Sequence, residues 1–213
     1  MTIDCIVCLS PNTHSFKTKK DERKYWHCKT CLSKFLDPSH YIEHGDEKER
    51  YLEHKNIIND AGYRKFLSKV TNPLQKLLNK DSLGLDYGCG HGPALADILE
   101  INGFKVDLYD PFFYPNKSIF NNKYKFVTCT EVAEHFFTPS EEFNKIDRML
   151  EKNGILAVMT SLITKDVIFE DWYYRRDPTH VVFYSEKSLH LIAKQRSWSC
   201  WEEDKNVFFF KKS

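Results

Sequence analysis

Apolar residues follow two different spacings from residue 61 onward. Between 63 and 78 they recur every three or four positions, which predicts one face of a helix, although Thr71-Asn72-Pro73 is expected to break or kink it. Short apolar runs that are typical of buried strands then alternate with further helical stretches. The strands are expected at 83–87, 104–109, 124–130, 154–160 and 207–210, the helices at 93–101, 139–151 and 185–196, and a polar turn at 202–206. This alternation predicts an α/β fold, a doubly wound and mostly parallel sheet with helices on both faces.

The first 60 residues do not follow this pattern. Residues 1–36 are rich in cysteine and predict a small separate unit. Residues 37–60 are highly charged and predict a linker that becomes helical from Asp46, with a solvated charged face. The α/β domain is then expected to span 61–213.

Two cysteine pairs are the clearest feature of the N-terminal unit. Cys5 and Cys8 form one C-x-x-C turn, Cys28 and Cys31 form another, and 19 residues separate the pairs. This spacing predicts a four-cysteine zinc ribbon, in which four thiolates leave no open position on the metal, so the zinc is expected to be structural. Zinc binding of about 10–16 kcal/mol would stabilise so short a segment. The alternatives are free thiols in unlinked turns, or replacement of one cysteine ligand by His14 or His27.

Composition narrows the class of protein further. The 213 residues carry 31 Lys and Arg against 30 Asp and Glu, and a net charge of +1 does not favour a general nucleic-acid binder. No apolar run approaches the roughly 20 residues that span a bilayer, and the N-terminus lacks the pattern of a signal peptide. An odd number of cysteines, seven, is a poor disulfide framework. We therefore expect a cytoplasmic protein without membrane contact, in which Cys89, Cys129 and Cys200 are small buried apolar residues.

The segment LGLDYGCGHGP, residues 83–93, carries candidate cofactor chemistry. An apolar run ends at Asp86 and is followed by Gly88, Gly90 and Gly92. A strand, a glycine turn and a helix are typical of a nucleotide-cofactor site, but the spacing is GxGxG and not the dinucleotide GxGxxG. Asp110 ends the next strand, 24 residues after Asp86, where a carboxylate can bind ribose hydroxyls. Two carboxylates and no cation for a pyrophosphate indicate S-adenosylmethionine, which is cationic and carries a ribose and an amine.

These residues, together with TEVAEH at 130–135, resemble the class I S-adenosylmethionine-dependent methyltransferases, which have a Rossmann-like fold, over residues 46–212. The stretches ERYLEHKN and YRRDPTHVVFYS resemble a bacterial subgroup in which a zinc ribbon precedes this domain. The resemblance implies a cofactor site made of Asp86, Gly88, Cys89, Gly90, Asp110, Pro111, Phe112, Thr130, Glu131 and Val132. The chain departs from the family by lacking a recognisable aspartate after a third strand and by having Lys125 before the fourth.

The segment 172–184, WYYRRDPTHVVFY, is expected to form a wall of the acceptor pocket. Its aromatic rings would stack on the acceptor, an arginine or histidine would orient it, and His180 would act as the base, with His135 as second candidate. The structural alternatives are an aromatic-anchored loop with a turn at Asp177-Pro178, and a His135 that only packs at a strand end. The activity expected is methyl transfer to an unidentified small molecule with a planar or aromatic part.

The alternative function is that of an RNA-modifying or RNA-binding protein, in which the zinc ribbon docks the RNA. The ribbon carries a basic hairpin in which lysines and an arginine interleave with aromatic rings, a pattern compatible with backbone contacts and base stacking. The residues concerned are Phe16, Lys17, Lys19, Lys20, Arg23, Lys24, Tyr25 and Trp26. A hairpin tip exposed to water has the same composition, and the ribbon could equally stabilise the domain or cover the acceptor site.

Overall fold

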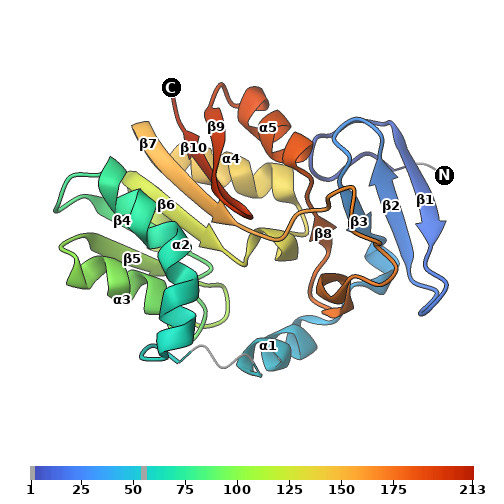
Figure 1. Cartoon of the computed structure of the whole chain (residues 1–213), viewed down its shortest axis with the longest axis horizontal. Coiled ribbons are helices and arrows are strands. Elements are labelled where there is room, and N and C mark those ends of the chain that lie inside the picture. Colours follow the sequence, from blue (N-terminus) through green and yellow to red (C-terminus); the bar gives the residue numbers. More distant parts are fainter. Residues whose placement is uncertain (1–2, 54–56) are drawn as a thin grey trace.

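Two β-sheets lie side by side in the computed structural model, which describes residues 3–53 and 57–213 (Figure 1). The larger sheet has six strands in the order β5-β4-β6-β7-β10-β9. The strands are β4 (Leu83–Tyr87), β5 (Lys105–Tyr109), β6 (Tyr124–Thr130), β7 (Leu150–Met159), β9 (Ser199–Asp204) and β10 (Val207–Lys211). Strands β5, β4, β6 and β7 are parallel, and β10 runs antiparallel to both β7 and β9. The predicted mostly parallel sheet is confirmed.

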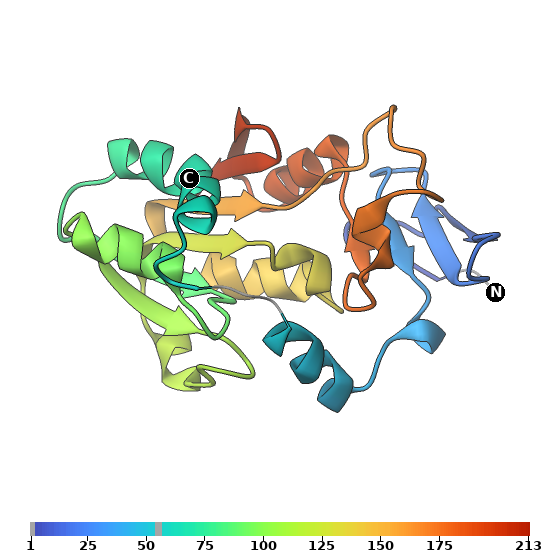
Figure 2. The same cartoon turned by 60° about the horizontal axis from the view of Figure 1, so that its bottom comes forward.

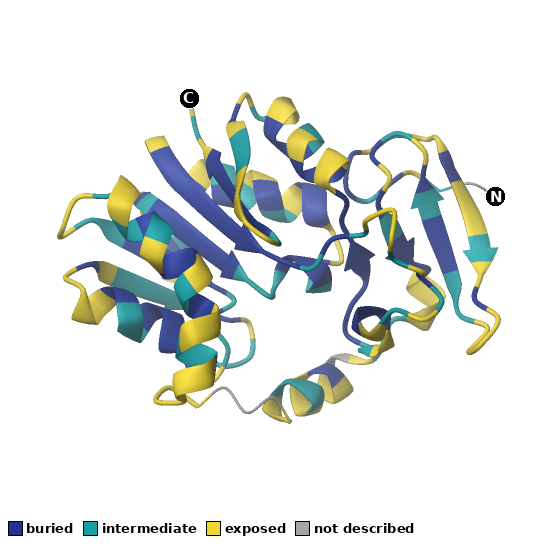
Figure 3. Ribbon diagram, viewed as in Figure 1, coloured by how far each residue is buried: buried dark blue, intermediate teal, exposed yellow. Residues whose placement is uncertain are grey.

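Helices cover both faces of this sheet. Helices α2 (Ala61–Leu77) and α3 (Ala94–Ile101) lie on one face, and α4 (Pro139–Met149) and α5 (Glu186–Gln195) on the other (Figure 1). Successive residues of a strand point to opposite faces. On β7, Ala157 and Met159 pack in the cluster that contains α2 and α3, whereas Leu156 and Val158 pack with α4 and α5. The inner strands β4, β6, β7 and β10 are therefore largely buried on both sides, the edge strands β5 and β9 are partly exposed, and the helices keep an exposed outer face (Figure 3).

Two local predictions are wrong. Helix α2 continues through Pro73 instead of breaking at 71–73. The proline frees the carbonyl of Lys69, which is an exposed residue and can meet water, while Val70 and Leu74 are fully buried against the sheet and offset the loss. The predicted turn at 202–206 is mostly strand, since β9 extends to Asp204. Its charged residues reflect an edge strand with an exposed face and not a turn.

The smaller sheet combines three strands of the N-terminal unit with one strand from much later in the chain. Its order is β1-β2-β3-β8, with β1 (Thr13–Lys17), β2 (Lys24–Cys28), β3 (Lys34–Leu36) and β8 (Val182–Phe183). The first three strands belong to the cysteine-rich unit, whereas β8 comes from the aromatic segment 172–184. Strand β8 pairs antiparallel with β3, and the amide of Leu36 donates to the carbonyl of Val181 at 2.8 Å. The N-terminal unit is thus packed into the larger domain.

Helix α1 (His44–Leu52) connects the two parts. In the turned view of Figure 2 it lies below both sheets, between the small sheet and the glycine turn of the large one. The predicted helix within the charged linker is confirmed. Among the described residues, none of the helices combines the length and the apolar character that crossing a bilayer requires.

Candidate functional site

A cavity of about 860 Å³ opens at the carboxyl ends of β4, β5 and β6. One wall is formed by the segments that follow these strands, from Tyr87, Tyr109 and Thr130 onward. The opposite wall comes from α1 and from a short 3-10 helix, η4 (Tyr173–Arg176), in the aromatic segment. This is the edge of a parallel sheet at which α/β proteins generally bind their ligands.

The glycine turn after β4 has a backbone that requires glycine. Gly88 and Gly90 have φ values of +84° and +64°, in the left-handed region. A Cβ on Gly88 would lie 2.5 Å from the side chain of Val132, so the turn also packs too closely for any larger residue. The amides of Gly88 and Cys89 both donate to the carbonyl of Tyr109, at 2.7 and 3.1 Å. The turn is therefore held against the end of β5.

Asp110 lies where this turn meets the end of β5. One carboxylate oxygen accepts from the amide of Gly90 at 3.1 Å, and the other accepts from the amides of Phe112 and Phe113 at 2.8 and 3.1 Å. These bonds orient the carboxylate at the cavity wall. All of the predicted cofactor residues line the cavity except Asp86.

Asp86 lies behind the cavity wall. It is 4% exposed and accepts a hydrogen bond from the Thr128 hydroxyl at 2.8 Å. Burial raises the pKa of its carboxyl to about 7, and the charge of Asp110 adds to the effect. The side chain therefore lies beneath the turn and outside the cavity lining, and its expected place near the cofactor amine stays a prediction.

The segment after β6 brings two further carboxyl groups to the site. Glu131 has a φ of +52°, and its amide donates to the carbonyl of Met159 at 2.8 Å. Burial, together with the charge of Glu134, raises the pKa of Glu131 to about 9. Glu134 is fully buried, and one of its carboxylate oxygens accepts from the Thr160 hydroxyl at 2.9 Å. Burial also raises the pKa of Glu134.

The two candidate histidines stand together. The ring centroids of His135 and His180 are 4.7 Å apart. Nδ1 of His180 lies 2.7 Å from the carbonyl of Tyr174, and Nδ1 of His135 lies 3.0 Å from the carbonyl of Thr179. Since a carbonyl only accepts, each ring holds a proton on Nδ1. Burial, and next the neighbouring His135, lowers the pKa of His180 to about 4, so this ring is neutral near pH 7.

Helix α1 supplies a part of the cavity wall, although its charged sequence predicts a linker with a solvated face. Glu47, Arg50 and Tyr51 line the cavity. Arg50 binds the carboxylate of Asp177 through Nε and Nη2 at 3.2 and 2.8 Å, which ties α1 to the aromatic segment. The ring of Tyr51 lies 5.3 Å from that of His135. The spacing of the three residues along one helix face was the available signal.

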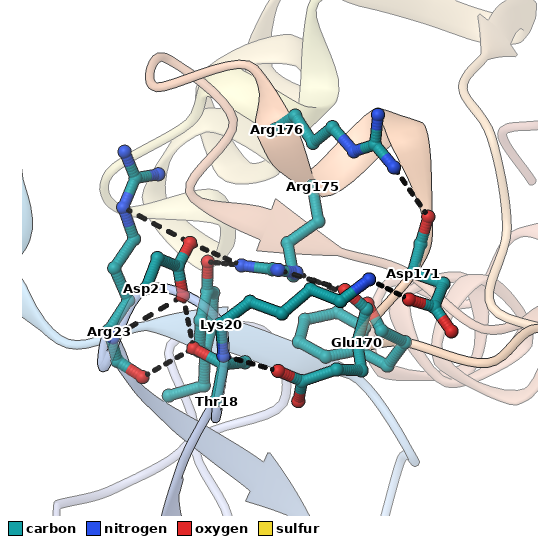
Figure 4. A network of polar contacts seen from close by, with 10 residues as sticks. Thr18, Lys20, Asp21, Arg23, Glu170, Asp171, Arg175 and Arg176 are labelled. Carbon is teal, nitrogen blue, oxygen red and sulfur yellow. Dashed lines mark hydrogen bonds and ion pairs between the residues drawn. The ribbon is translucent and has the colours of Figure 1, made fainter.

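Side chains of the aromatic segment contact either the cavity or the ribbon. Tyr173, Tyr174, Arg176, Asp177 and His180 line the cavity. Arg175 instead extends into the ribbon, where its guanidinium donates to Asp21 at 2.7 Å and to the Tyr25 hydroxyl at 3.3 Å (Figure 4). The segment therefore lines the cavity with one set of side chains and anchors the ribbon with another, and its role toward an acceptor stays a prediction.

The four predicted metal-ligating cysteines converge. Sγ of Cys5 lies 3.6 Å from Sγ of Cys31, Sγ of Cys8 lies 3.6 Å from Sγ of Cys28, and all four lie within 4.8 Å of one another. Zinc–sulfur bonds of about 2.3 Å in a tetrahedron place neighbouring sulfurs about 3.8 Å apart, whereas a disulfide needs about 2.05 Å. The arrangement fits a tetrahedral metal without a histidine.

The remaining cysteines follow the prediction in part. Cys89 and Cys129 are buried, whereas Cys200 is only half-buried.

The basic hairpin of the ribbon does not present the surface that RNA stacking needs. Tyr25 and Trp26 are 1% and 2% exposed, so neither ring is available to a base. Three of its five cations are engaged within the chain: Lys20 pairs with Asp171 (Figure 4), Arg23 lies 3.7 Å from Asp21, and Lys24 lies 2.9 Å from Asp37. The stacking role proposed for these two rings is wrong, because both belong to the core.

Comparison with known proteins identifies the larger domain. A family model described as a methyltransferase domain matches residues 60–203. No curated protein matches the chain by sequence. Among solved structures, the 1,6-didemethyltoxoflavin-N1-methyltransferase of Burkholderia thailandensis, solved with 1,6-didemethyltoxoflavin and S-adenosylhomocysteine, has 11% identity and a TM-score of 0.53, covering 94% of this chain and 99% of that one.

Two further structures show the same fold. The PH0226 protein of Pyrococcus horikoshii has 16% identity and a TM-score of 0.52, covering 76% of this chain and 96% of that one. An O-methyltransferase family protein of Burkholderia thailandensis has 12% identity and a TM-score of 0.52, covering 78% of this chain and 62% of that one. Because the family model spans more than half of the chain and its elements form the site described above, the protein belongs to the methyltransferase domain family.

Proposed function

We propose that the protein is an S-adenosylmethionine-dependent methyltransferase that acts on a small molecule with a planar or aromatic part. The observation that carries this proposal is the cavity at the carboxyl ends of β4, β5 and β6, where the glycine turn and Asp110 meet inside the matched family domain. The neighbour that was solved with S-adenosylhomocysteine and a flat heterocycle supports the same class of ligands.

The polar groups of the sheet wall fit this cofactor. Within the described part of the chain, the cavity-lining residues between Tyr87 and His135 include no lysine or arginine, but they include Asp110 and the carboxyl groups of Glu131 and Glu134. A pyrophosphate would find no cation here, whereas a sulfonium compound with a ribose and an amine finds the carboxylate of Asp110, further oxygen acceptors and backbone groups. When bound, the cofactor supplies an activated methyl group, and the protein mainly has to align the acceptor with it.

The chain's own residues divide the binding task. We propose that Asp110 accepts hydrogen bonds from the ribose hydroxyls and that the neighbouring Pro111 and Phe112 border the adenine. The backbone of Gly88, Cys89 and Gly90, together with Thr130, Glu131 and Val132, would then surround the methionine part. The rings of Tyr51 and Tyr174 border the rest of the cavity and suit a planar acceptor.

His180 and His135 are the proposed groups for handling the acceptor's proton. Both rings carry their hydrogen on Nδ1, so Nε2 holds the lone pair that a base needs. The low pKa keeps His180 neutral, as a proton acceptor must be, but also makes it a weak base. We expect His180→Ala to lower turnover far more than cofactor affinity.

We propose that the ribbon holds a structural zinc and positions the acceptor wall. Strand β3 of the ribbon pairs with β8, and the Ser185 hydroxyl donates to the carbonyl of Cys31 at 2.6 Å. The segment that carries Tyr174 and His180 is therefore attached to the metal-binding loop. Loss of zinc would disturb the acceptor side of the cavity before the cofactor side.

Titration calorimetry with S-adenosylmethionine and S-adenosylhomocysteine tests the proposal. We expect both to bind and Asp110→Asn to weaken binding by about tenfold or more, because a charged acceptor contributes about 1.5–3 kcal/mol. The matched control is Asp97→Asn on the outer helix α3, whose carboxylate pairs with Arg64 outside the cavity and whose loss should leave affinity unchanged. Absence of binding of both ligands to the wild type would refute the proposed function.

A further inference from the structure

Three side chains on the acceptor side of the cavity converge on one point. Glu134 and His135 belong to a short 3-10 helix, η3 (Ala133–His135), and His180 lies 45 residues further along, just before β8. Each offers one ligand atom, and these atoms all lie within 4.8 Å of one another. Bonds of about 2.0–2.2 Å place two ligand atoms on one ion at most about 4.4 Å apart, so these atoms lie near the spacing that a single ion requires.

Glu134 carries a polar atom that the fold leaves unpaired. The residue is 0% exposed, and only one of its carboxylate oxygens is bound, to the Thr160 hydroxyl. The second oxygen, Oε1, has no hydrogen-bond donor among the described residues. Buried polar atoms nearly always have a partner, because leaving one without a donor is costly, and more so for a charged group. A positively charged ligand at this oxygen would supply the partner that the fold does not.

The two histidines have the orientation of metal ligands. Each ring uses its Nδ1–H on a backbone carbonyl, that of Tyr174 for His180 and that of Thr179 for His135. Such a bond fixes the tautomer that has its lone pair on Nε2 and raises the basicity of that nitrogen toward a metal. His180 is only 9% exposed and His135 is half-buried, so both rings are held at the cavity wall.

We propose that Glu134, His135 and His180 bind a divalent transition-metal ion on the acceptor side of the cavity. Two imidazoles and one carboxylate are a ligand set for ions such as Fe²⁺, Co²⁺ and Zn²⁺. Three protein ligands leave coordination positions open, unlike the four cysteines of the ribbon, which close their metal completely. The open positions face the cavity, because all three residues line it.

A role of this metal site in turnover rests on the proposed methyltransferase function. An ion at this position acts as a Lewis acid, and an acceptor hydroxyl beside it loses its proton more readily. That proton passes to solvent, and the new oxygen–carbon bond forms as the sulfur–carbon bond of the cofactor breaks. The acceptor class is therefore a small molecule with a hydroxyl group. His180 then serves as a ligand and not as the base, because the metal occupies its lone pair.

Cobalt binding tests the site without requiring the acceptor. Protein whose ribbon zinc has been quantified by elemental analysis is titrated with Co²⁺ and followed by absorption. We expect one further equivalent of metal, with the weak visible bands of nitrogen and oxygen ligation and no thiolate-to-cobalt charge-transfer band. His135→Asn, His180→Asn and Glu134→Gln should each weaken cobalt binding by about tenfold or more. The asparagines keep a donor for the carbonyls, and the glutamine keeps the volume of Glu134.

The control is His190→Ala, which removes a histidine that lies outside the cavity beside Glu186 and should leave cobalt binding unchanged. The proposal is overturned if the wild type shows only the thiolate band, if it shows no visible band, or if the three variants bind cobalt as the wild type does. Cobalt binding at this site without S-adenosylmethionine binding would refute the proposed function and leave the metal site standing. Cofactor binding without cobalt binding would do the reverse.

Discussion

Adjacent arginines in the aromatic segment are predicted to have opposite importance for stability. The side chain of Arg175 is 3% exposed, and its guanidinium donates to the carbonyls of Phe169 and Glu170 at 3.2 and 2.9 Å. It also binds Asp21 and the Tyr25 hydroxyl in the ribbon. Arg176 is exposed, and its guanidinium donates a long hydrogen bond of 3.4 Å to the carbonyl of Asp171.

The magnitude follows from these contacts. A buried hydrogen bond from a charged donor contributes about 1.5–3 kcal/mol, so the two carbonyl bonds dominate. The pair with Asp21 contributes less than about 1 kcal/mol, since that carboxylate is 36% exposed and screened by water. We expect Arg175→Ala to lower the free energy of unfolding by about 4 kcal/mol, which corresponds to a Tm lower by about 8–16 °C. Arg176→Ala should change it by less than about 0.5 kcal/mol.

Thermal unfolding of the two variants beside the wild type measures the difference. Arg175→Lys separates charge from shape, since a lysine keeps the positive charge but cannot reach both carbonyls and Asp21 at once. We expect it to recover less than half of the lost stability. Equal Tm values for Arg175→Ala and Arg176→Ala would refute the reasoning, because they would mean that the guanidinium does not hold the ribbon against the aromatic segment.

Three further predictions concern other parts of the molecule. Cys28→Ser should remove one equivalent of zinc in elemental analysis and lower the Tm, whereas Cys200→Ser should keep the zinc; equal zinc contents would contradict the four-cysteine site. The pKa of Asp86 is raised from 3.8 to about 7, so its contribution to stability is complete below its ordinary pKa and is lost as pH rises through about 7. Asp86→Asn should therefore stabilise the cofactor-free protein more at about pH 8 than at about pH 5, and a pH-independent difference in Tm would exclude this cause. Arg50→Ala should speed hydrogen exchange of the amides of α1 about fivefold, for a pair with Asp177 of about 1 kcal/mol, while β4 stays protected; unchanged exchange in α1 would show that the pair does not hold the helix.

The larger domain could be predicted because its signals are local. Most of its strands contain a short apolar run, and its helices have an apolar face at regular spacing, so neighbouring residues carry the information. The glycine turn is equally local, since Gly88 and Gly90 adopt positive φ within one short segment. The errors arose where burial outweighed a local preference, as at Pro73 inside α2, or where an edge strand kept polar residues, as in β9.

The candidate site was predicted less completely. The sheet side of the cavity follows strand ends, so the residues that line it could be named, while Asp86 lies behind them because it packs beside Thr128. The opposite side draws on α1 and the aromatic segment, which are distant in sequence. Nothing in the local pattern distinguishes Arg175 from Arg176, although one is buried in the ribbon and the other lines the cavity.

Consecutive residues alone were enough to predict the α/β alternation, the glycine turn and the two cysteine pairs, because backbone conformation and ligand spacing at short range depend on neighbouring positions. The folded chain was needed to show that β8 completes the sheet of the ribbon and that α1 borders the cavity. It was also needed to bring Glu134 and His135 together with His180. These contacts join residues far apart in the chain, and they depend on the packing of the aromatic segment and the ribbon in one shared core.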